Sequence, residues 1–195
     1  MDNNTAFSAG VRFGGLTDRT EIKILVCYLL TGAKQPLTEQ QIVDTVIGQQ
    51  LANYFELLDA LSHLTEQNLV TEHDGMYSIT EDGKEISRQL EKVIPFSVRE
   101  RAYKAVIEIL QYDALKKQNK TKITAVEGGG FNLNCTIEDE NFVLFSCDLF
   151  MPNEKSALTA QESFIKYGQD IFKCILGITT SNPAMYKDFL ESQNK

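Results

Sequence analysis

The chain of 195 residues contains few side chains whose types and spacing could support catalysis or metal binding. Its two histidines, His63 and His73, have no cysteine or carboxylate at a spacing typical of metal ligands. No G-x-S-x-G, H-E-x-x-H or G-x-x-x-x-G-K-[ST] string occurs. We therefore predict no catalytic residues, no cofactor and no metal site, although folding could still bring distant ligands together. An enzyme is the least favoured class of function.

Two further segments resemble ligand-binding motifs, but turns explain them better. Gly128–Gly130 could cradle a phosphate, yet these glycines lie between two predicted strands and no helix N-terminus follows to face an anion. Glu138–Glu140 could bind a hard cation, but this run lacks a glycine-turned loop of alternating ligands. We interpret the first as a flexible hairpin turn and the second as a solvated turn.

Four cysteines stand far apart and form no C-x-x-C pair: Cys27, Cys135, Cys147 and Cys174. We interpret them as reduced, mostly buried thiols of a cytoplasmic protein. A disulfide between Cys135 and Cys147 on neighbouring strands is the alternative. The longest apolar run, Ile24–Leu30, is far shorter than the roughly 20 residues that cross a bilayer, and the first residues do not resemble a secretory signal. We expect a cytoplasmic protein that makes no membrane contact.

The first half of the chain predicts four helices and one hairpin, preceded by a flexible arm at residues 1–16. Residues that favour helix N-termini precede or begin each helical run: Thr17, Thr38, Asn53 and Thr80. Residues 38–41 have the pattern of a capping box, and residues 35–37 before them predict a short extended link. Asp74-Gly75 separates two strand-like runs and favours a tight hairpin turn, because both residues tolerate positive φ. The order helix, helix, helix, hairpin, helix over residues 17–95 is typical of a winged helix-turn-helix domain. In this domain the third helix is the recognition helix and the hairpin is the wing.

Residues 96–178 predict a small helix/three-stranded antiparallel sheet/helix sandwich, which makes the fold class α+β. A long helix is expected from Ser97, and a final helix is expected from Asn153, broken near Gly168. The strands are expected at 122–127, 131–137 and 142–151. The middle strand alternates apolar and polar residues, which predicts that one of its faces is buried. We expect this domain to serve dimerisation, which makes a homodimer the expected assembly, or to sense a small molecule. Residues 179–195 form a mostly polar tail.

Five segments of the sequence carry a resemblance to a bacterial family: Gly15–Leu25, Pro36–Thr38, Asn53–Phe55, Tyr77–Gly83 and Pro95–Glu100. Through them the chain, from about residue 11 to 178, resembles domain of unknown function 4364. Members of that family are described as winged-helix transcriptional regulators. The resemblance implies a winged-helix fold and, by analogy of fold, DNA binding.

The net charge is distributed unevenly along the chain. The total is −8, from 19 Lys and Arg against 27 Asp and Glu. Residues 1–83 alone carry −8, residues 84–122 carry +5 and residues 123–195 carry −5. The cations of the middle segment form either a solvated helix face or a positive surface for nucleic acid or a second subunit. No Lys or Arg occurs from Gln35 to Gly83, the span of the predicted recognition helix and wing. Because phosphate contacts supply much of the affinity for DNA, this span disfavours ordinary DNA docking.

Two functions follow from these observations. The leading one is a transcriptional regulator with a DNA-binding winged helix and a C-terminal dimerisation or sensing domain. The residues expected to contact DNA are Asn53, Tyr54, Gln49, Gln50, Arg12, Arg19 and Lys84. The alternative is a winged-helix protein–protein interaction module that does not bind DNA, because its recognition helix and wing are acidic. Its contact residues are Glu56, Asp59, His63, Glu72 and Asp74.

Overall fold

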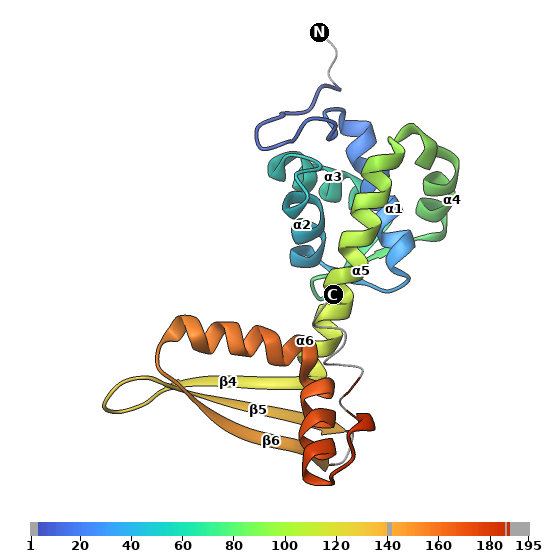
Figure 1. Ribbon diagram of the computed structural model, residues 1–195. Helices are drawn as coiled ribbons and strands as arrows, with labels where there is room; N and C mark the ends of the chain where they lie inside the picture. The colour runs from blue at the N-terminus through green and yellow to red at the C-terminus, as the bar shows by residue number, and fades with distance from the viewer. Residues whose placement is uncertain (1–3, 140–141, 186, 188–195) are drawn as a thin grey trace. The chain divides into compact units, whose positions relative to one another are not determined.

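The computed structural model describes residues 4–139, 142–185 and 187 (Figure 1). Within them the chain has six α-helices and two three-stranded antiparallel sheets, so the predicted mixed α+β class is confirmed. The chain divides into two compact units, residues 1–110 and 111–195, and each has its own hydrophobic core. No helix in the described ranges combines the length and the apolar character needed to cross a bilayer.

The N-terminal unit is built mainly from helices, with one small sheet. Its elements are α1 (Arg19–Ala33), β1 (Leu37–Thr38), α2 (Glu39–Gly48), α3 (Tyr54–Glu66), β2 (Val70–His73), β3 (Met76–Ile79), α4 (Glu81–Leu90), a 3-10 turn (Glu91–Val93) and the start of α5 (Phe96–Gln118). The strands are ordered β1-β3-β2. The short strand β1 was expected only as an extended link.

Polar side chains fix where these helices begin. Thr38 accepts a hydrogen bond from the Gln41 backbone N–H, and the Gln41 side chain accepts one from the Thr38 backbone N–H, which forms the predicted capping box. Thr80 caps α4 as expected. α1 is capped by Asp18 rather than Thr17, because the Asp18 carboxylate accepts from two backbone N–H groups of the first turn. The acid also suits the positive end of the helix dipole.

The hairpin β2–β3 turns at the predicted dipeptide. Asp74 has φ 52° and Gly75 has φ 74°, so both central residues adopt the left-handed region that this tight turn requires. Val70 is fully buried where β2 leaves the core, whereas the rest of β2 is exposed. β2 is therefore the exposed edge strand, whereas β3 lies between β1 and β2 and packs against the core through Tyr77 and Ile79.

The segment before α1 lies against the unit. The sequence predicts a flexible arm at 1–16, but the Ala6 N–H donates to the Thr17 carbonyl at 2.8 Å and the Leu16 N–H donates to the Leu51 carbonyl at 2.7 Å. Ala6 and Leu16 are both buried in the N-terminal core. The apolar side chains among the small polar residues explain why this segment is attached.

Helix α5 contributes its first half to the N-terminal core. Val98, Ala102 and Val106, spaced by one helical turn, are fully buried there. The sequence had grouped this helix with the second domain and placed the boundary after Pro95. The division of the structure instead falls after Leu110, inside the helix, because the apolar face of α5 packs on the first unit.

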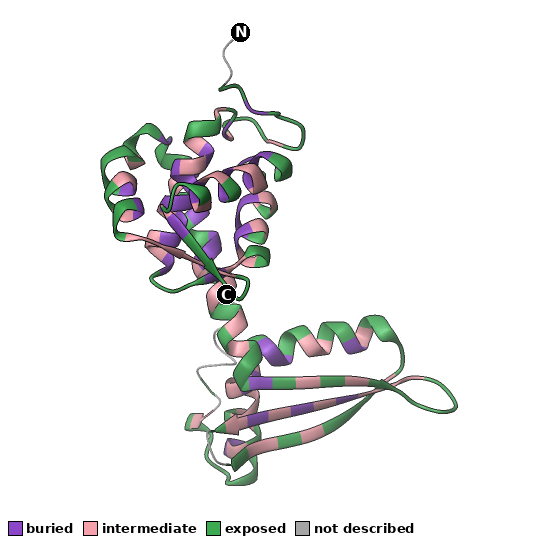
Figure 2. Cartoon of the chain, turned by 180° about the vertical axis from the view of Figure 1, so that it is seen from behind, coloured by how far each residue is buried: buried purple, intermediate pink, exposed green. Residues whose placement is uncertain are grey.

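The C-terminal unit is a three-stranded meander with one long helix. Its elements after α5 are β4 (Asn119–Ala125), β5 (Phe131–Asp139), β6 (Phe142–Met151) and α6 (Glu154–Thr179), with strand order β4-β5-β6. Burial alternates along β5 (Figure 2). Leu133, Cys135 and Ile137 form a core with Phe164 of α6. The alternation predicted for the middle strand is therefore confirmed.

Helix α6 is assigned as one continuous helix where the sequence predicted a break near Gly168, although its two halves run in clearly different directions (Figure 1). Gly168 is buried against Asn119, and a Cβ at position 168 would lie 2.8 Å from Asn119 Cγ. The Asn119 amide donates to the Ile165 carbonyl at 2.8 Å. The glycine thus permits a close approach of helix and strand. A helix-breaking residue and a close-contact residue look alike in the sequence.

Candidate functional site

Asn53, the N-cap residue of α3, makes its side-chain hydrogen bonds within the protein. Asn53 is only 7 % exposed. Its side-chain oxygen accepts from the Phe55 N–H at 2.9 Å and its amide donates to the Ala9 carbonyl at 2.8 Å. The side chain caps α3 and ties down the preceding segment, so the structure places the first DNA-contact candidate in the interior. The neighbouring aromatic rings of Tyr54 and Phe55 are exposed and meet edge to face, with centroids 5.6 Å apart.

Glu56, expected on an acidic surface, is also satisfied internally. Its side chain is 8 % exposed and bonds to Arg19, with Nε to Oε2 at 2.9 Å. The Phe7 backbone N–H donates to Oε1 at 2.9 Å. That backbone hydrogen bond, reinforced by the Arg19 guanidinium and opposed by burial, holds the pKa of Glu56 below its ordinary value. Arg19 and Glu56 therefore neutralise each other at the first turn of α3.

The remaining DNA-contact candidates divide between two places. The Arg12 backbone N–H donates to the Gln50 carbonyl at 3.1 Å, so these two exposed residues lie together before α3, next to the half-buried Gln49. Lys84 lies elsewhere, on α4, where it pairs with Glu81 at 2.6 Å. The structure thus brings Arg12, Arg19, Gln50 and Asn53 to the start of α3 through the N-terminal segment.

The other acidic candidates lie farther along α3 and on the hairpin. Asp59 and His63, one turn apart on α3, approach at 3.3 Å with both side chains 44 % exposed. Asp74 stands at the hairpin tip beside His73, at 2.9 Å. Glu72 on β2 accepts from the Gly75 N–H at 3.3 Å. Apart from Glu56, the predicted protein-contact residues are therefore at least partly exposed.

A pocket of about 410 Å³ separates α3 from the hairpin. It contains three glutamates and no lysine or arginine, over a partly apolar floor. Its lining residues are Glu39, Leu58, Leu61, Ser62, Thr65, Glu66, Glu72 and Tyr77. We call it the acidic pocket. Burial raises the pKa of the Tyr77 phenol, and the nearby Glu39 and Glu72 carboxylates raise it further.

Sequence reasoning identified only Glu72 among these three acids. Glu39 was seen as a residue of the capping box, and Glu66 lies near the end of α3. The available signal was the absence of Lys and Arg from Gln35 to Gly83, because any pocket formed within that span has no cation of its own.

Two of the four cysteines, Cys27 and Cys135, are buried in the cores of the two units. All four are free thiols, and Cys135 pairs in register with Cys147 across β5 and β6 without forming a disulfide. Burial raises the pKa of Cys27 to about 11 and that of Cys135 to about 12, which leaves little thiolate at neutral pH. Among the described residues, no three His, Cys, Asp or Glu side chains gather as a metal-binding group.

Fold and site together define a two-unit α+β protein with an acidic candidate site on its N-terminal unit. The chain belongs to the family described as domain of unknown function (DUF4364), whose model matches residues 22–178. The family predicted from the sequence motifs is thereby confirmed. Comparison with curated proteins and with solved structures finds no match.

Proposed function

We propose that the N-terminal unit is a winged-helix interaction module that binds a basic segment of a protein partner at the acidic pocket. The element order from α1 to α4, with α3 in the recognition position and β2–β3 as the wing, supports the winged-helix assignment. The single observation that carries the function is the composition of the pocket between these two elements. It has three carboxylates and no cation where a DNA-binding winged helix needs positive charge.

The pocket has the two surfaces that a lysine or arginine side chain requires. Leu58 and Leu61 supply apolar surface for the aliphatic stem. Glu66 and Glu72 come from different elements and supply carboxylates for the charged head. No described cation makes an ion pair with Glu39, Glu66 or Glu72, so no positive side chain neutralises them. Glu72 accepts from the Gly75 N–H and Glu39 is hydrogen-bonded to the Tyr77 phenol, and both remain negatively charged in these contacts.

The test is a fluorescence-anisotropy titration of the full chain with a labelled lysine-rich peptide. The triple variant Glu39→Gln, Glu66→Gln, Glu72→Gln is expected to bind about tenfold or more weakly, since complementary charge across the contact is lost. The matched control is Glu85→Gln, Glu100→Gln, Glu108→Gln, which removes equal charge from exposed positions on α4 and α5. An equal loss in both variants would mean that net charge alone attracts the peptide, and would overturn the proposal.

A second candidate function is DNA binding by a transcriptional regulator. It is favoured by the element order and by the exposed Arg12, Gln50 and Tyr54 near the N-terminus of α3. In this candidate the C-terminal unit supplies dimerisation or sensing, and the protein acts in the cytoplasm as a homodimer. The test is affinity for mixed genomic duplex fragments at increasing salt. Real phosphate contacts give a log–log slope of roughly −0.9 per phosphate, and no binding at low salt would exclude the candidate.

A further inference from the structure

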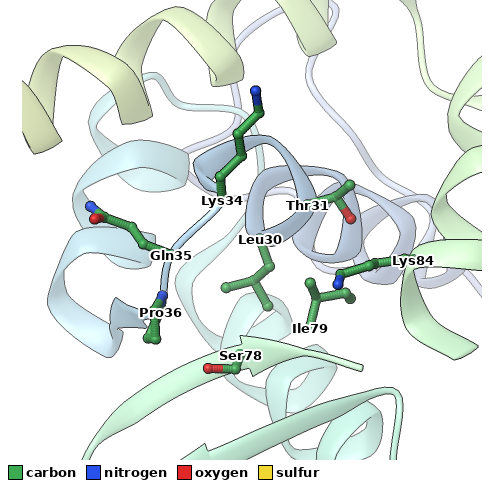
Figure 3. A pocket seen from close by; sticks show the side chains of 8 residues that line it. All are labelled: Leu30, Thr31, Lys34, Gln35, Pro36, Ser78, Ile79 and Lys84. Carbon is green, nitrogen blue, oxygen red and sulfur yellow. The ribbon is translucent and has the colours of Figure 1, made fainter. Parts of the chain in front are cut away.

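A second pocket of the N-terminal unit has the opposite charge. It has a volume of about 350 Å³ and lies where the end of α1, the link to β1, β3 and the start of α4 meet (Figure 3). It is lined by Leu30, Thr31, Lys34, Gln35, Pro36, Ser78, Ile79 and Lys84. We call it the lysine pocket. We propose that it binds a small organic anion, with the anionic oxygens held by Lys34 and Lys84 and an apolar group against the pocket wall.

The fold places both lysines at the border of one pocket. Lys34 and Lys84 are the first cations on either side of the long span without Lys or Arg. They are far apart in the sequence, yet both line this one pocket, and no carboxylate lines it with them. In a unit with a large negative charge, this is a local concentration of positive potential.

The surroundings of the lysines leave charge for a ligand. In Figure 3 the Lys84 ammonium is directed inward, between Thr31 and Ile79, whereas the Lys34 side chain extends from the end of α1 away from the other labelled side chains. Lys34 is exposed, so its flexible stem has to turn inward to reach an anion beside Lys84. The Glu81 partner of Lys84 is 84 % exposed, and such exposed pairs contribute little, so a ligand can compete with it. Lys34 has no acidic side chain within 4.0 Å in the part of the chain that the structure describes.

Polar and apolar groups of the lining define the class of ligand. Ser78 supplies a hydroxyl donor for an anionic oxygen. The Thr31 hydroxyl donates to the Cys27 carbonyl at 2.7 Å, so its proton is already used and it adds no donor for the anion. Leu30, Pro36 and Ile79 supply the apolar wall. A carboxylate or a phosphate ester that carries a small apolar group matches both surfaces, and the volume is within the range of small-molecule sites.

One local field opposes an anion. The pocket lies at the C-terminal end of α1, where the helix dipole places partial negative charge. Lys34 is the C-cap residue of that helix and offsets this charge. Binding is therefore expected to depend on the lysines rather than on backbone groups.

The experiment is an NMR titration of the full chain with benzoate and with phenyl phosphate. It follows methyl shifts of Leu30 and Ile79, with benzyl alcohol and inorganic phosphate as further probes. Both organic anions are expected to bind, and binding of only one of them would narrow the class to carboxylates or to phosphates. Benzyl alcohol and inorganic phosphate are each expected to bind about tenfold more weakly, because the alcohol lacks an anionic group and inorganic phosphate lacks an apolar group.

Variants make the test specific to the pocket. The double variant Lys34→Met, Lys84→Met is expected to lose at least tenfold in affinity, whereas Lys84→Arg keeps the charge and retains binding. The control Lys92→Met, Lys104→Met removes two exposed cations outside the pocket and is expected to leave affinity unchanged. Equal affinity of the double variant and the wild type, or an equal loss in the control, would overturn the proposal. The result does not depend on peptide binding at the acidic pocket.

Discussion

The two ends of α3 both carry glutamates, but the protein uses them differently. At the first turn, Glu56 is buried and holds Arg19 and the Phe7 N–H. Near the last turn, Glu66 is exposed and shares the acidic pocket with Glu72 of the hairpin. The first carboxylate fixes structure and the others leave charge on the surface. Acidic residues of one helix thus have separate roles, and only their partners distinguish them.

The largest expected effect is on the free energy of unfolding, and it distinguishes the two ends of α3. Glu56→Ala leaves the Phe7 N–H and the Arg19 guanidinium without their acceptor, and is expected to lower the free energy of unfolding by about 2 kcal/mol. Glu66→Ala, an exposed change on the same helix, is expected to alter it by less than about 0.5 kcal/mol. Urea unfolding followed by far-ultraviolet circular dichroism measures both. Similar values for the two variants would contradict the distinction.

The pH dependence of that stability difference follows from the lowered pKa of Glu56. Because the folded-state pKa lies below the unfolded value of about 4.3, the contribution is complete above that pH and is lost as pH falls through the folded-state pKa. The difference between wild type and Glu56→Ala should be similar at pH 7 and pH 5 and smaller at pH 3. A difference that stays constant down to pH 3 would show that the Glu56 carboxylate is not the stabilising species.

A smaller effect is expected at Tyr77. Replacing Glu39 and Glu72 by glutamine should lower the pKa of Tyr77, although burial keeps it above the ordinary value. Glu66→Gln is the control, because Glu66 is not among the causes of the shift. The measurement is phenolate absorption against pH, with the Tyr77→Phe spectrum subtracted to isolate this residue. If the control lowers the pKa as far as the double variant does, the assigned positions of these glutamates are wrong.

Local signals predicted much of the fold. The capping box at Thr38, the turn at Asp74-Gly75 and the alternation along β5 involve residues close in sequence, and each was confirmed. The attachment of residues 4–16 and the packing of α5 were not predicted, because they depend on contacts between distant segments. Gly168 shows the same limit, since its partner Asn119 is far away in the chain.

The sequence predicted the negative charge of the candidate site but not which residues form it. The span from Gln35 to Gly83 without cations indicated an acidic face. Asn53 and Glu56 were predicted to contact a partner because their internal hydrogen-bond partners are distant in the sequence. Ala9 and Phe7 lie in the segment predicted to be a flexible arm, and Arg19 begins α1. Only the three-dimensional arrangement shows that Glu39 and Glu66 join Glu72 at one pocket.

Two probes compared on the same full chain of 195 residues distinguish peptide binding from DNA binding. Anisotropy is measured at low salt with a labelled lysine-rich peptide and with a labelled duplex DNA of mixed sequence. The peptide is expected to bind, with an affinity that weakens as salt rises and is lost in the Glu39, Glu66, Glu72 variant, while DNA does not bind. DNA binding at low salt that loses affinity linearly on a log–log plot against salt, with no peptide binding, would contradict the proposed peptide-binding function of the acidic pocket.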